Sequence, residues 1–192
     1  MNPENTLIPL KDNIVLIGMP ASGKSTCGVL LAKRMGYQFL DTDLLIQSQE
    51  NRRLIAIIKE KGLTGFCRIE EQWLLRVNLQ RHVIATGGSA VYSARAMAHL
   101  KSCGVTVYLF AEPEQLRQRL TDWDTRGIIA APAQTLDALF KERDPLYRQH
   151  AQLIVDTTGL TQAQTADAII AALKKGVSRT KDISHGLTGW TG

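Results

Sequence analysis

The 192-residue sequence has few cysteines, no long apolar run and no basic run interleaved with aromatic residues. Its three cysteines, Cys27, Cys67 and Cys103, are widely separated and odd in number, which argues against both a disulfide framework and a zinc cluster. No apolar run approaches the length of a membrane span, and the polar residues 1–5 do not form a signal peptide. We therefore expect a cytoplasmic protein with reduced thiols and no membrane partner.

Basic residues nevertheless outnumber acidic ones, and the formal net charge is +5 at pH 7. Without a basic and aromatic stretch, this charge does not indicate nucleic-acid binding; a site built to hold anions explains it better. The length fits one domain, and the sequence contains no internal repeat. We expect a monomer with a single domain over residues 1–175.

Residues 18–26 contain the complete pattern G-x-x-x-x-G-K-[ST], directly after the apolar residues 14–17. In a loop between a strand and a helix, backbone N–H groups can point into a concavity that a polyphosphate fills, and the helix dipole favours the anion. The two glycines permit backbone conformations that a Cβ would penalise, the lysine can reach the β- and γ-phosphates, and the following hydroxyl can ligate Mg²⁺. The pattern predicts that ATP, with Mg²⁺, is bound by Gly18, Ala21, Ser22, Gly23, Lys24, Ser25 and Thr26.

Short apolar segments recur along the chain with helical segments between them, beginning with a helix over residues 24–35. This alternation predicts an α/β fold in which a parallel sheet is covered on both faces and a ligand lies at the carboxyl ends of the strands. The predicted strands cover residues 14–17, 38–40, 83–85, 105–110 and 153–155.

Three segments depart from this alternation. A long helical insertion between Asp43 and Arg81 forms either a substrate-binding subdomain or extra packing helices. Residues 121–134 combine glycine, proline and small residues with one cation, Arg126, as a mobile lid requires. Residues 176–192 are rich in Gly, Ser, Thr and Lys and are expected to form a flexible tail.

Two polar clusters follow predicted strands at the edge where the ligand is expected. Asp41 and Asp43 come after the second strand, so that one carboxylate can act on the Mg²⁺ shell while the other reaches a substrate hydroxyl. Helix capping is the alternative role for such a pair. Residues 86–89, Thr-Gly-Gly-Ser, follow the third strand, where adjacent glycines allow a ligand to approach the backbone or simply form a turn.

A further candidate is Arg143, within the sequence Arg-Asp-Pro-Leu-Tyr at the end of the helix expected after the lid. Its planar guanidinium could clamp a carboxylate or a phosphate, although most arginines are simply solvated.

Taken together, these motifs resemble the shikimate kinase family. The resemblance covers the phosphate loop, the D-T-D sequence, the F-x-R-I-E-E stretch at residues 66–71, A-T-G-G-S at residues 85–89, Arg126 and R-D-P-L-Y at residues 143–147. It implies a three-layer fold like that of nucleoside monophosphate kinases, with a five-stranded parallel sheet of order 2-3-1-4-5. It also implies an acceptor-binding subdomain at about residues 43–80 and a lid at residues 121–134.

The resemblance also implies roles for individual residues. Ser25 and Asp41 would bind Mg²⁺, while Lys24 and Arg126 would act on the transferring phosphoryl group. Asp43 would hold, and could deprotonate, the acceptor hydroxyl. The acceptor pocket would be lined by Gly87, Gly88 and Ser89. Arg143 would pair with the carboxylate of the acceptor, and Arg119 would pack on adenine.

The sequence departs from the family pattern mainly on the acceptor side. Family members usually carry an arginine directly after Phe66, as half of a carboxylate clamp, where this chain has Cys67. Arg68 does not replace it, since one step along a helix rotates a side chain by about 100°. Ser89 replaces a third glycine, and the family's proline-containing adenine loop has no clear counterpart in residues 157–161.

The function that follows is transfer of the ATP γ-phosphoryl group to a hydroxyl of a small carboxylate-bearing metabolite, with shikimate as the first candidate. The alternatives are another hydroxy acid such as homoserine, a gluconate-like or nucleotide acceptor, and an ATP-binding module without turnover. The last of these would be expected to have lost Lys24, Asp41, Asp43 or Arg126, and all four are present.

Overall fold

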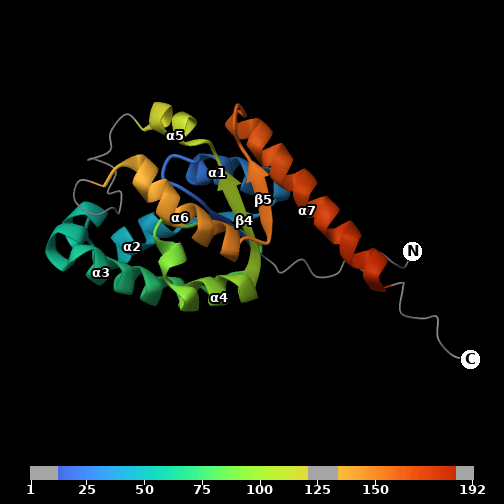
Figure 1. Ribbon diagram of the computed structural model, residues 1–192. Coiled ribbons are helices and arrows are strands. Elements are labelled where there is room, and N and C mark those ends of the chain that lie inside the picture. The colour runs from blue at the N-terminus through green and yellow to red at the C-terminus, as the bar shows by residue number, and fades with distance from the viewer. Residues whose placement is uncertain (1–12, 121–133, 185–192) are drawn as a thin grey trace, which may run out of the picture.

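The computed structural model describes residues 13–120 and 134–184, and for residues 176–184 it describes the backbone only. Strands alternate with helices along these ranges, as the sequence predicted (Figure 1). The strands are β1 (Asn13–Ile17), β2 (Gln38–Asp41), β3 (His82–Ala85), β4 (Gly104–Phe110) and β5 (Leu153–Asp156). The helices are α1 (Lys24–Met35), α2 (Thr42–Glu50), α3 (Leu54–Leu74), the 3-10 helix η1 (Ala90–Tyr92), α4 (Ala94–Cys103), α5 (Pro113–Arg119), α6 (Leu136–His150) and α7 (Gln162–Ser184).

The five strands form one parallel sheet of order β2-β3-β1-β4-β5, which confirms the predicted topology. In the central strand, Leu16 pairs with Ala85 of β3 on one side and Val107 of β4 on the other. Because all strands run the same way, their carboxyl ends meet at one edge of the sheet. The loops that follow β1, β2 and β3 therefore come together there, as expected for ligand sites in this class of fold.

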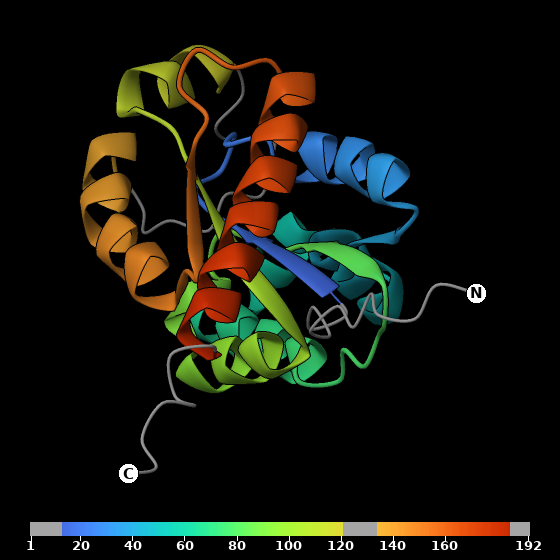
Figure 2. The same ribbon diagram turned by 90° about the vertical axis from the view of Figure 1, so that its right-hand side faces the viewer.

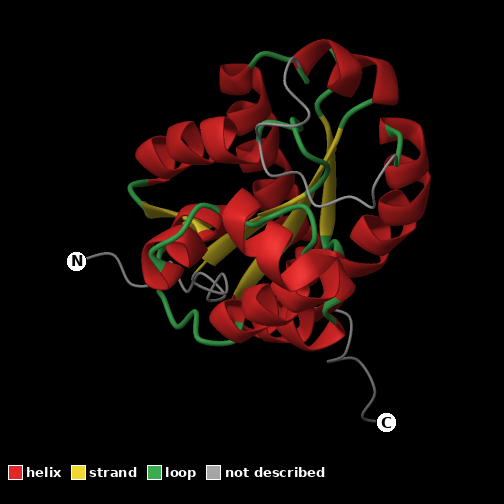
Figure 3. Ribbon diagram, turned by 90° about the vertical axis from the view of Figure 1, so that its left-hand side faces the viewer, coloured by secondary structure: helices red, strands yellow, loops and turns green. Residues whose placement is uncertain are grey.

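Helices cover both faces of the sheet, and they lie in front of the strands in two opposite views (Figure 2 and Figure 3). Alternation along β1 explains the two cores, since successive side chains point to opposite faces. Ile14 and Leu16 pack with residues of α1 and α7, including Leu31 and Ile169. The other core joins β1 to α3, α4 and α6 through Val15, Ile17, Leu74, Met97, Leu100, Leu139 and Tyr147.

The predicted insertion folds as α2 and α3. A small core of its own, made by Ile46, Leu54, Ile57 and Phe66, holds the two helices together. Helix α3 is kinked at Gly62, where the backbone is not helical (φ 68°, ψ 178°). Gly62 thus divides α3 into two helical stretches within the predicted insertion.

Residues 143–147 lie within α6 and not at its end, where the sequence analysis placed them. The helix continues through Pro145 to His150 because packing on both sides of the proline holds it. Tyr147 stacks on Tyr108 of β4, with ring centroids 5.0 Å apart. Asp144 accepts hydrogen bonds from Tyr108 Oη (2.9 Å) and from Arg148 Nε (2.8 Å).

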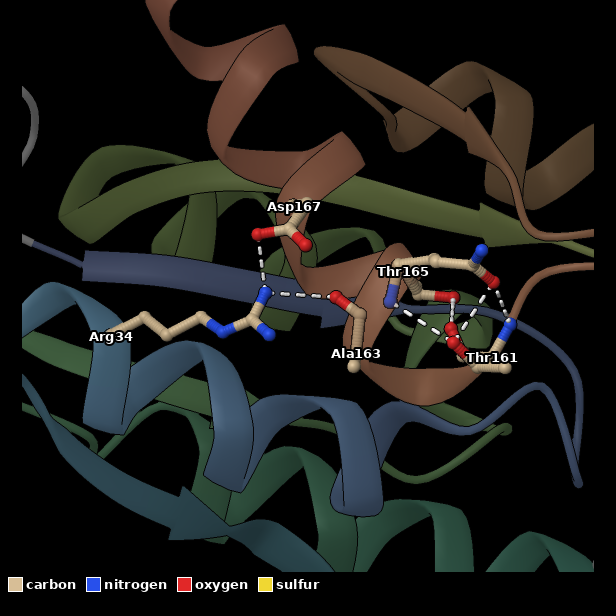
Figure 4. Close-up of polar contacts among 6 residues, drawn as sticks. Arg34, Thr161, Ala163, Thr165 and Asp167 are labelled. Atoms are coloured by element: carbon tan, nitrogen blue, oxygen red, sulfur yellow. Dashed lines mark hydrogen bonds and ion pairs between the residues drawn. The ribbon is translucent and has the colours of Figure 1, made fainter.

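The last helix, α7, starts at a capping box in which Thr161 and Gln164 bond to each other (Figure 4). Arg34 of α1 ties the first turns of α7 in place by donating to Ala163 O (2.9 Å) and pairing with Asp167. The helix runs to residue 184 and so passes residue 176, where the sequence analysis began a flexible tail. A single glycine at position 176 costs a helix only about 1 kcal/mol, which is too little to end it.

Residues 121–133, including most of the predicted lid, and residues 185–192 of the predicted tail lie outside the described residues. Within the part of the chain that the structure describes, no helix is both long and apolar enough to cross a membrane.

Candidate active site

The phosphate loop, residues 18–23, joins the buried strand β1 to α1, which begins and ends where the sequence predicted. Gly18 and Gly23 both have positive φ (146° and 93°), and a Cβ at position 18 would lie 2.8 Å from Leu109 O. Ala21 also has positive φ (62°), a conformation that is uncommon for a residue with a side chain and that often occurs at functional sites. The glycines of the motif are thus required by the path of the loop.

Lys24, the first residue of α1, is buried, and its Nζ donates hydrogen bonds to Gly18 O and Met19 O, both at 2.8 Å. Burial lowers its pKa to about 8, while Asp43 and Asp41 act in the opposite direction. At pH 7 the side chain is therefore still mostly cationic and is held against the loop by neutral carbonyl groups. Such a cation can turn from these carbonyls to a bound phosphate.

Asp41 ends β2 and uses its two carboxylate oxygens differently. Oδ1 accepts from the backbone N–H groups of Asp43 (3.0 Å) and Leu44 (3.3 Å) and so caps α2. Oδ2 accepts from the Ser25 hydroxyl at 2.6 Å, beside the phosphate loop. Helix capping and the pairing with Ser25 therefore occur together.

The Ser25 hydroxyl oxygen and Asp41 Oδ2 fit the requirements of a magnesium site. Mg²⁺ prefers oxygen ligands and is commonly bound by one or two protein groups together with substrate phosphates and water. The hydrogen bond between Ser25 and Asp41 is solvent-accessible and adjoins the loop that would hold the phosphates. A cation could replace the hydroxyl proton as the partner of Oδ2.

Asp43, the second residue of α2, has a buried Oδ1 atom without a hydrogen-bond partner. Burial raises the pKa of this carboxyl to about 6, with a further contribution from Asp41 and an opposing one from Lys24. At pH 7 the group is mostly ionised yet close to its pKa, which suits a residue that accepts a proton.

The loop after β3 brings Gly87 and Gly88 against charged side chains from three helices. A Cβ at position 87 would collide with Glu70 Oε1 and lie 2.7 Å from Asp43 Oδ1, and one at position 88 would lie 3.0 Å from Arg143 Nη1. Gly87 N–H donates to Thr42 Oγ1 at 3.2 Å, which fixes the loop to the start of α2. The two glycines are therefore needed for close approach.

Arg143 of α6 reaches the same place from the other side. It is 1% exposed, its Nε donates to Tyr92 Oη at 2.9 Å, and its guanidinium carbon lies 4.9 Å from the centroid of the Tyr92 ring. Tyr147 donates to Gly88 O at 2.7 Å and so holds the loop beside this arginine. A buried guanidinium against a glycine backbone can bind a carboxylate that lies on that backbone.

Glu70 of α3 also belongs to this site, although the sequence analysis did not select it as a site residue. It is 1% exposed, its Oε2 accepts a 2.5 Å hydrogen bond from Ser89 Oγ, and its buried Oε1 has no hydrogen-bond partner. The available signal was its position four residues after the buried Phe66, on the same face of the helix. Cys67 lies on the same helix and is half-buried, and burial together with Glu70 raises its pKa.

Arg119 is the last residue of α5, and its Nη1 is buried without a hydrogen-bond partner. With the Gln115 amide turned so that its oxygen faces Arg119, that oxygen accepts from Arg119 Nη2 (3.1 Å) and from Gly159 N (2.9 Å). The Gln162 side chain, also not selected from the sequence, packs directly on Gly23. Polar side chains thus gather beyond the phosphate loop, where a nucleotide base would lie.

The structure therefore brings together the predicted residues of the phosphate loop, Asp41, Asp43, the two glycines, Ser89 and Arg143 at one edge of the sheet. Arg126, the predicted lid cation, lies outside the described residues.

Comparison with known proteins gives a consistent result. The sequence profile of the shikimate kinase family matches residues 20–174. A shikimate kinase from Thiobacillus denitrificans is 37% identical over 150 residues, which cover 77% of this chain and 82% of that protein. One from Nitrosococcus oceani is 35% identical over 182 residues, covering 92% of this chain and 96% of that protein.

Solved structures agree with these sequence matches. A shikimate kinase from Acinetobacter baumannii, solved in complex with shikimate, superposes with a TM-score of 0.80 at 32% identity, covering 86% of this chain and 94% of that one. A deoxyadenosine kinase from M. mycoides, at 13% identity and a TM-score of 0.57, covers 85% of this chain and 98% of that one and shares the fold alone. The chain belongs to the shikimate kinase family.

Proposed function

We propose that this protein transfers the γ-phosphoryl group of ATP to a hydroxyl group of shikimate. Membership of the family supports the reaction class, a phosphotransferase acting on an alcohol. The observation that carries the proposal is the position of Asp43, whose buried carboxylate adjoins Gly87 and lies within the electrostatic reach of Lys24. A proton acceptor and a phosphate-binding cation therefore serve one site.

On the nucleotide side, the phosphates would lie in the loop of residues 18–23, with Lys24 neutralising charge on the β- and γ-phosphates. Ser25 and Asp41 would hold Mg²⁺, which when bound supplies further neutralisation of the phosphoryl charge. The buried, unpartnered guanidinium nitrogen of Arg119 supports a contact with adenine.

On the acceptor side, Asp43 would hold the reacting hydroxyl and accept its proton as the oxygen bonds to the γ-phosphorus and the bond to ADP breaks. Gly87 and Gly88 would allow the acceptor to lie against the backbone, and Arg143 would pair with its carboxylate. We further propose that α2 and α3 form the acceptor-binding subdomain, that Arg126 assists from the lid, and that the protein acts as a cytoplasmic monomer.

The test is a coupled assay of ADP release with ATP, Mg²⁺ and a panel of acceptors that includes shikimate, homoserine and gluconate. We expect shikimate to give the highest kcat/KM. In the Asp43→Asn variant, turnover should fall by at least about a thousandfold, since general-base catalysis contributes 10²–10⁴-fold and positioning adds to it. ATP affinity measured by calorimetry should change little, because Asp43 lies on the acceptor side.

Three results would contradict the proposal. ADP release that no acceptor increases would indicate an ATPase, and no ADP release with any acceptor would indicate an ATP-binding module without turnover. Turnover of Asp43→Asn near the level of the unmodified protein would remove the assignment of Asp43 as the base.

A further inference from the structure

The proposed reaction leaves one buried carboxyl group, that of Glu70, without a role. Glu70 projects from α3 to the loop after β3, where Oε2 accepts the Ser89 hydrogen bond and Oε1 adjoins Gly87. Asp43 Oδ1 adjoins the same glycine, and both oxygens are buried without hydrogen-bond partners. Two carboxyl groups from different helices thus meet beside Gly87 at the proposed acceptor site, each with one buried oxygen that has no hydrogen-bond partner.

The charged groups that act on Glu70 come from helices α1, α2 and α6. Asp43 of α2 opposes its ionisation, whereas Lys24 of α1, Arg143 of α6 and the hydrogen bond from Ser89 favour it. Its own helix contributes Cys67, a thiol whose ionisation Glu70 itself disfavours. Burial outweighs the favourable contributions and raises the pKa of Glu70 to about 8.

The hydrogen bonds show which oxygen of the neutral acid is left for a ligand. Oε2 is already engaged with Ser89, whereas Oε1 has no partner and adjoins Gly87, so Oε1 is the oxygen from which the neutral acid can donate to a ligand. A neutral carboxyl group has one O–H donor, whereas an ionised one can only accept. The pocket then presents a donor at Glu70 beside an acceptor at Asp43.

We propose that Glu70 is a specificity-determining residue that stays a neutral acid and donates a hydrogen bond from Oε1 to an oxygen of the acceptor, next to the hydroxyl held by Asp43. This inference deepens the proposed function, because it concerns the acceptor pocket of the same site. Glu70 and Asp43 together select acceptors that carry two oxygen atoms on neighbouring positions. They disfavour an acceptor whose ammonium group would occupy the place of the second oxygen, because a donor would face a donor.

The test compares Glu70→Gln, which keeps a donor but cannot ionise, with Glu70→Ala, which removes the donor. KM and kcat are measured from pH 6 to pH 9.5 at saturating ATP, with whichever acceptor gives the most ADP release. We expect KM of the unmodified protein to rise about tenfold per pH unit above pH 8 relative to Glu70→Gln, since the ionised carboxylate loses the donor. At pH 7, KM should change less than about threefold in Glu70→Gln and rise about tenfold or more in Glu70→Ala, with kcat changing little.

Glu71→Gln is the matched control. Glu71 is the next residue of α3, but its carboxylate bonds to Ser93 and Arg95 outside the pocket, so its KM profile should follow that of the unmodified protein. Lys24 and Asp43 titrate in all these variants, and the profile of Glu71→Gln shows what they contribute while Glu70 is unchanged.

A second measurement does not depend on turnover. A carboxyl pKa that is higher in the folded than in the unfolded state stabilises the fold below about pH 4.5, and this stabilisation is lost as pH rises towards 8. The thermal midpoint of Glu70→Gln relative to the unmodified protein should therefore increase from pH 5 to pH 8.

The proposal is overturned if this midpoint difference is independent of pH, or if Glu70→Gln raises KM at pH 7 as much as Glu70→Ala does. Failure of the proposed function would look different, because shikimate would not be turned over. The thermal midpoint difference between Glu70→Gln and the unmodified protein would still depend on pH. The KM values of Glu70→Gln and Glu70→Ala would still differ as described with the acceptor that is used.

Discussion

Cys67 occupies the position directly after Phe66 at which the family usually has an arginine. Its side chain is half-buried on α3, one turn before Glu70. Arg68 is exposed and gives no substitute, since the two positions differ by about 100° around the helix. Of the two clamp arginines that the family resemblance implies, this chain retains Arg143, so in the proposed function Arg143 alone would pair with the acceptor carboxylate.

Replacing Cys67 with arginine should restore the second half of the clamp. A charge-assisted hydrogen bond is worth about 1.5–3 kcal/mol, so KM for shikimate should fall by about ten- to a hundredfold in Cys67→Arg, as measured in the ADP-release assay. Arg68→Ala, the adjacent exposed change, should leave KM unchanged. An unaltered KM in Cys67→Arg, or activity that shifts to a different acceptor, would show that this position does not face the carboxylate.

Among the secondary-structure elements, α3 positions the acceptor side through a break in its backbone. Gly62 has φ 68° and ψ 178°, a region that is essentially restricted to glycine. The segment after this break carries Phe66 into the small core and Glu70 into the pocket. The geometry of the break therefore sets how the second half of α3 meets the loop after β3.

Gly62→Ala should strain this break by about 1–3 kcal/mol and lower the free energy of unfolding by a similar amount. Denaturant titration measures the change, and Thr64→Ala, an exposed substitution two residues further along α3, is the control. Since no atom lies near the position where a Cβ would be added, a loss of stability would be due to the backbone and not to a clash. Equal stability of both variants would refute the assigned role of the glycine.

Across the molecule as a whole, the residues proposed to contact the nucleotide and the acceptor share one sheet edge but come from different helices. The phosphate loop is continuous with β1 and α1, in the layer that α7 covers, whereas Glu70 and Arg143 come from α3 and α6 on the opposite face. Binding at the loop should therefore stabilise the cooperative unit to which both cores belong.

ATP with Mg²⁺, in the absence of an acceptor, should raise the stability of the protein by about 2.7 kcal/mol at a concentration of one hundred times Kd. The measurement is the thermal midpoint as a function of nucleotide concentration. In Lys24→Met the shift should be much smaller at the same concentrations, whatever the midpoint of that variant without nucleotide. A midpoint of the unmodified protein that does not respond to ATP and Mg²⁺ would contradict nucleotide binding itself.

Much of the fold was predictable because its signals are local. The helix over residues 24–35 and the five strands were found from periodicity and glycine positions, and strand bounds differ from those predicted by at most one residue at each end. The path of α6 through Pro145 was not predictable from the local rule that a proline ends a helix, since the stacking of Tyr147 on Tyr108 involves a distant strand. The extension of α7 past Gly176 likewise depended on the helix already being anchored at its start.

The phosphate loop and the carboxylates at the end of β2 could be read from the chain alone, because each depends on residues that are neighbours in sequence. The strand order was implied by the resemblance of the motifs to the shikimate kinase family. It took the packed molecule to show that Glu70 lies beside Asp43 and Ser89 in the site that Arg143 also reaches, and that burial raises the pKa of Glu70 to about 8. Proximity between distant segments and the removal of water from a charge arise when the helices pack on the sheet, and no local pattern encodes them.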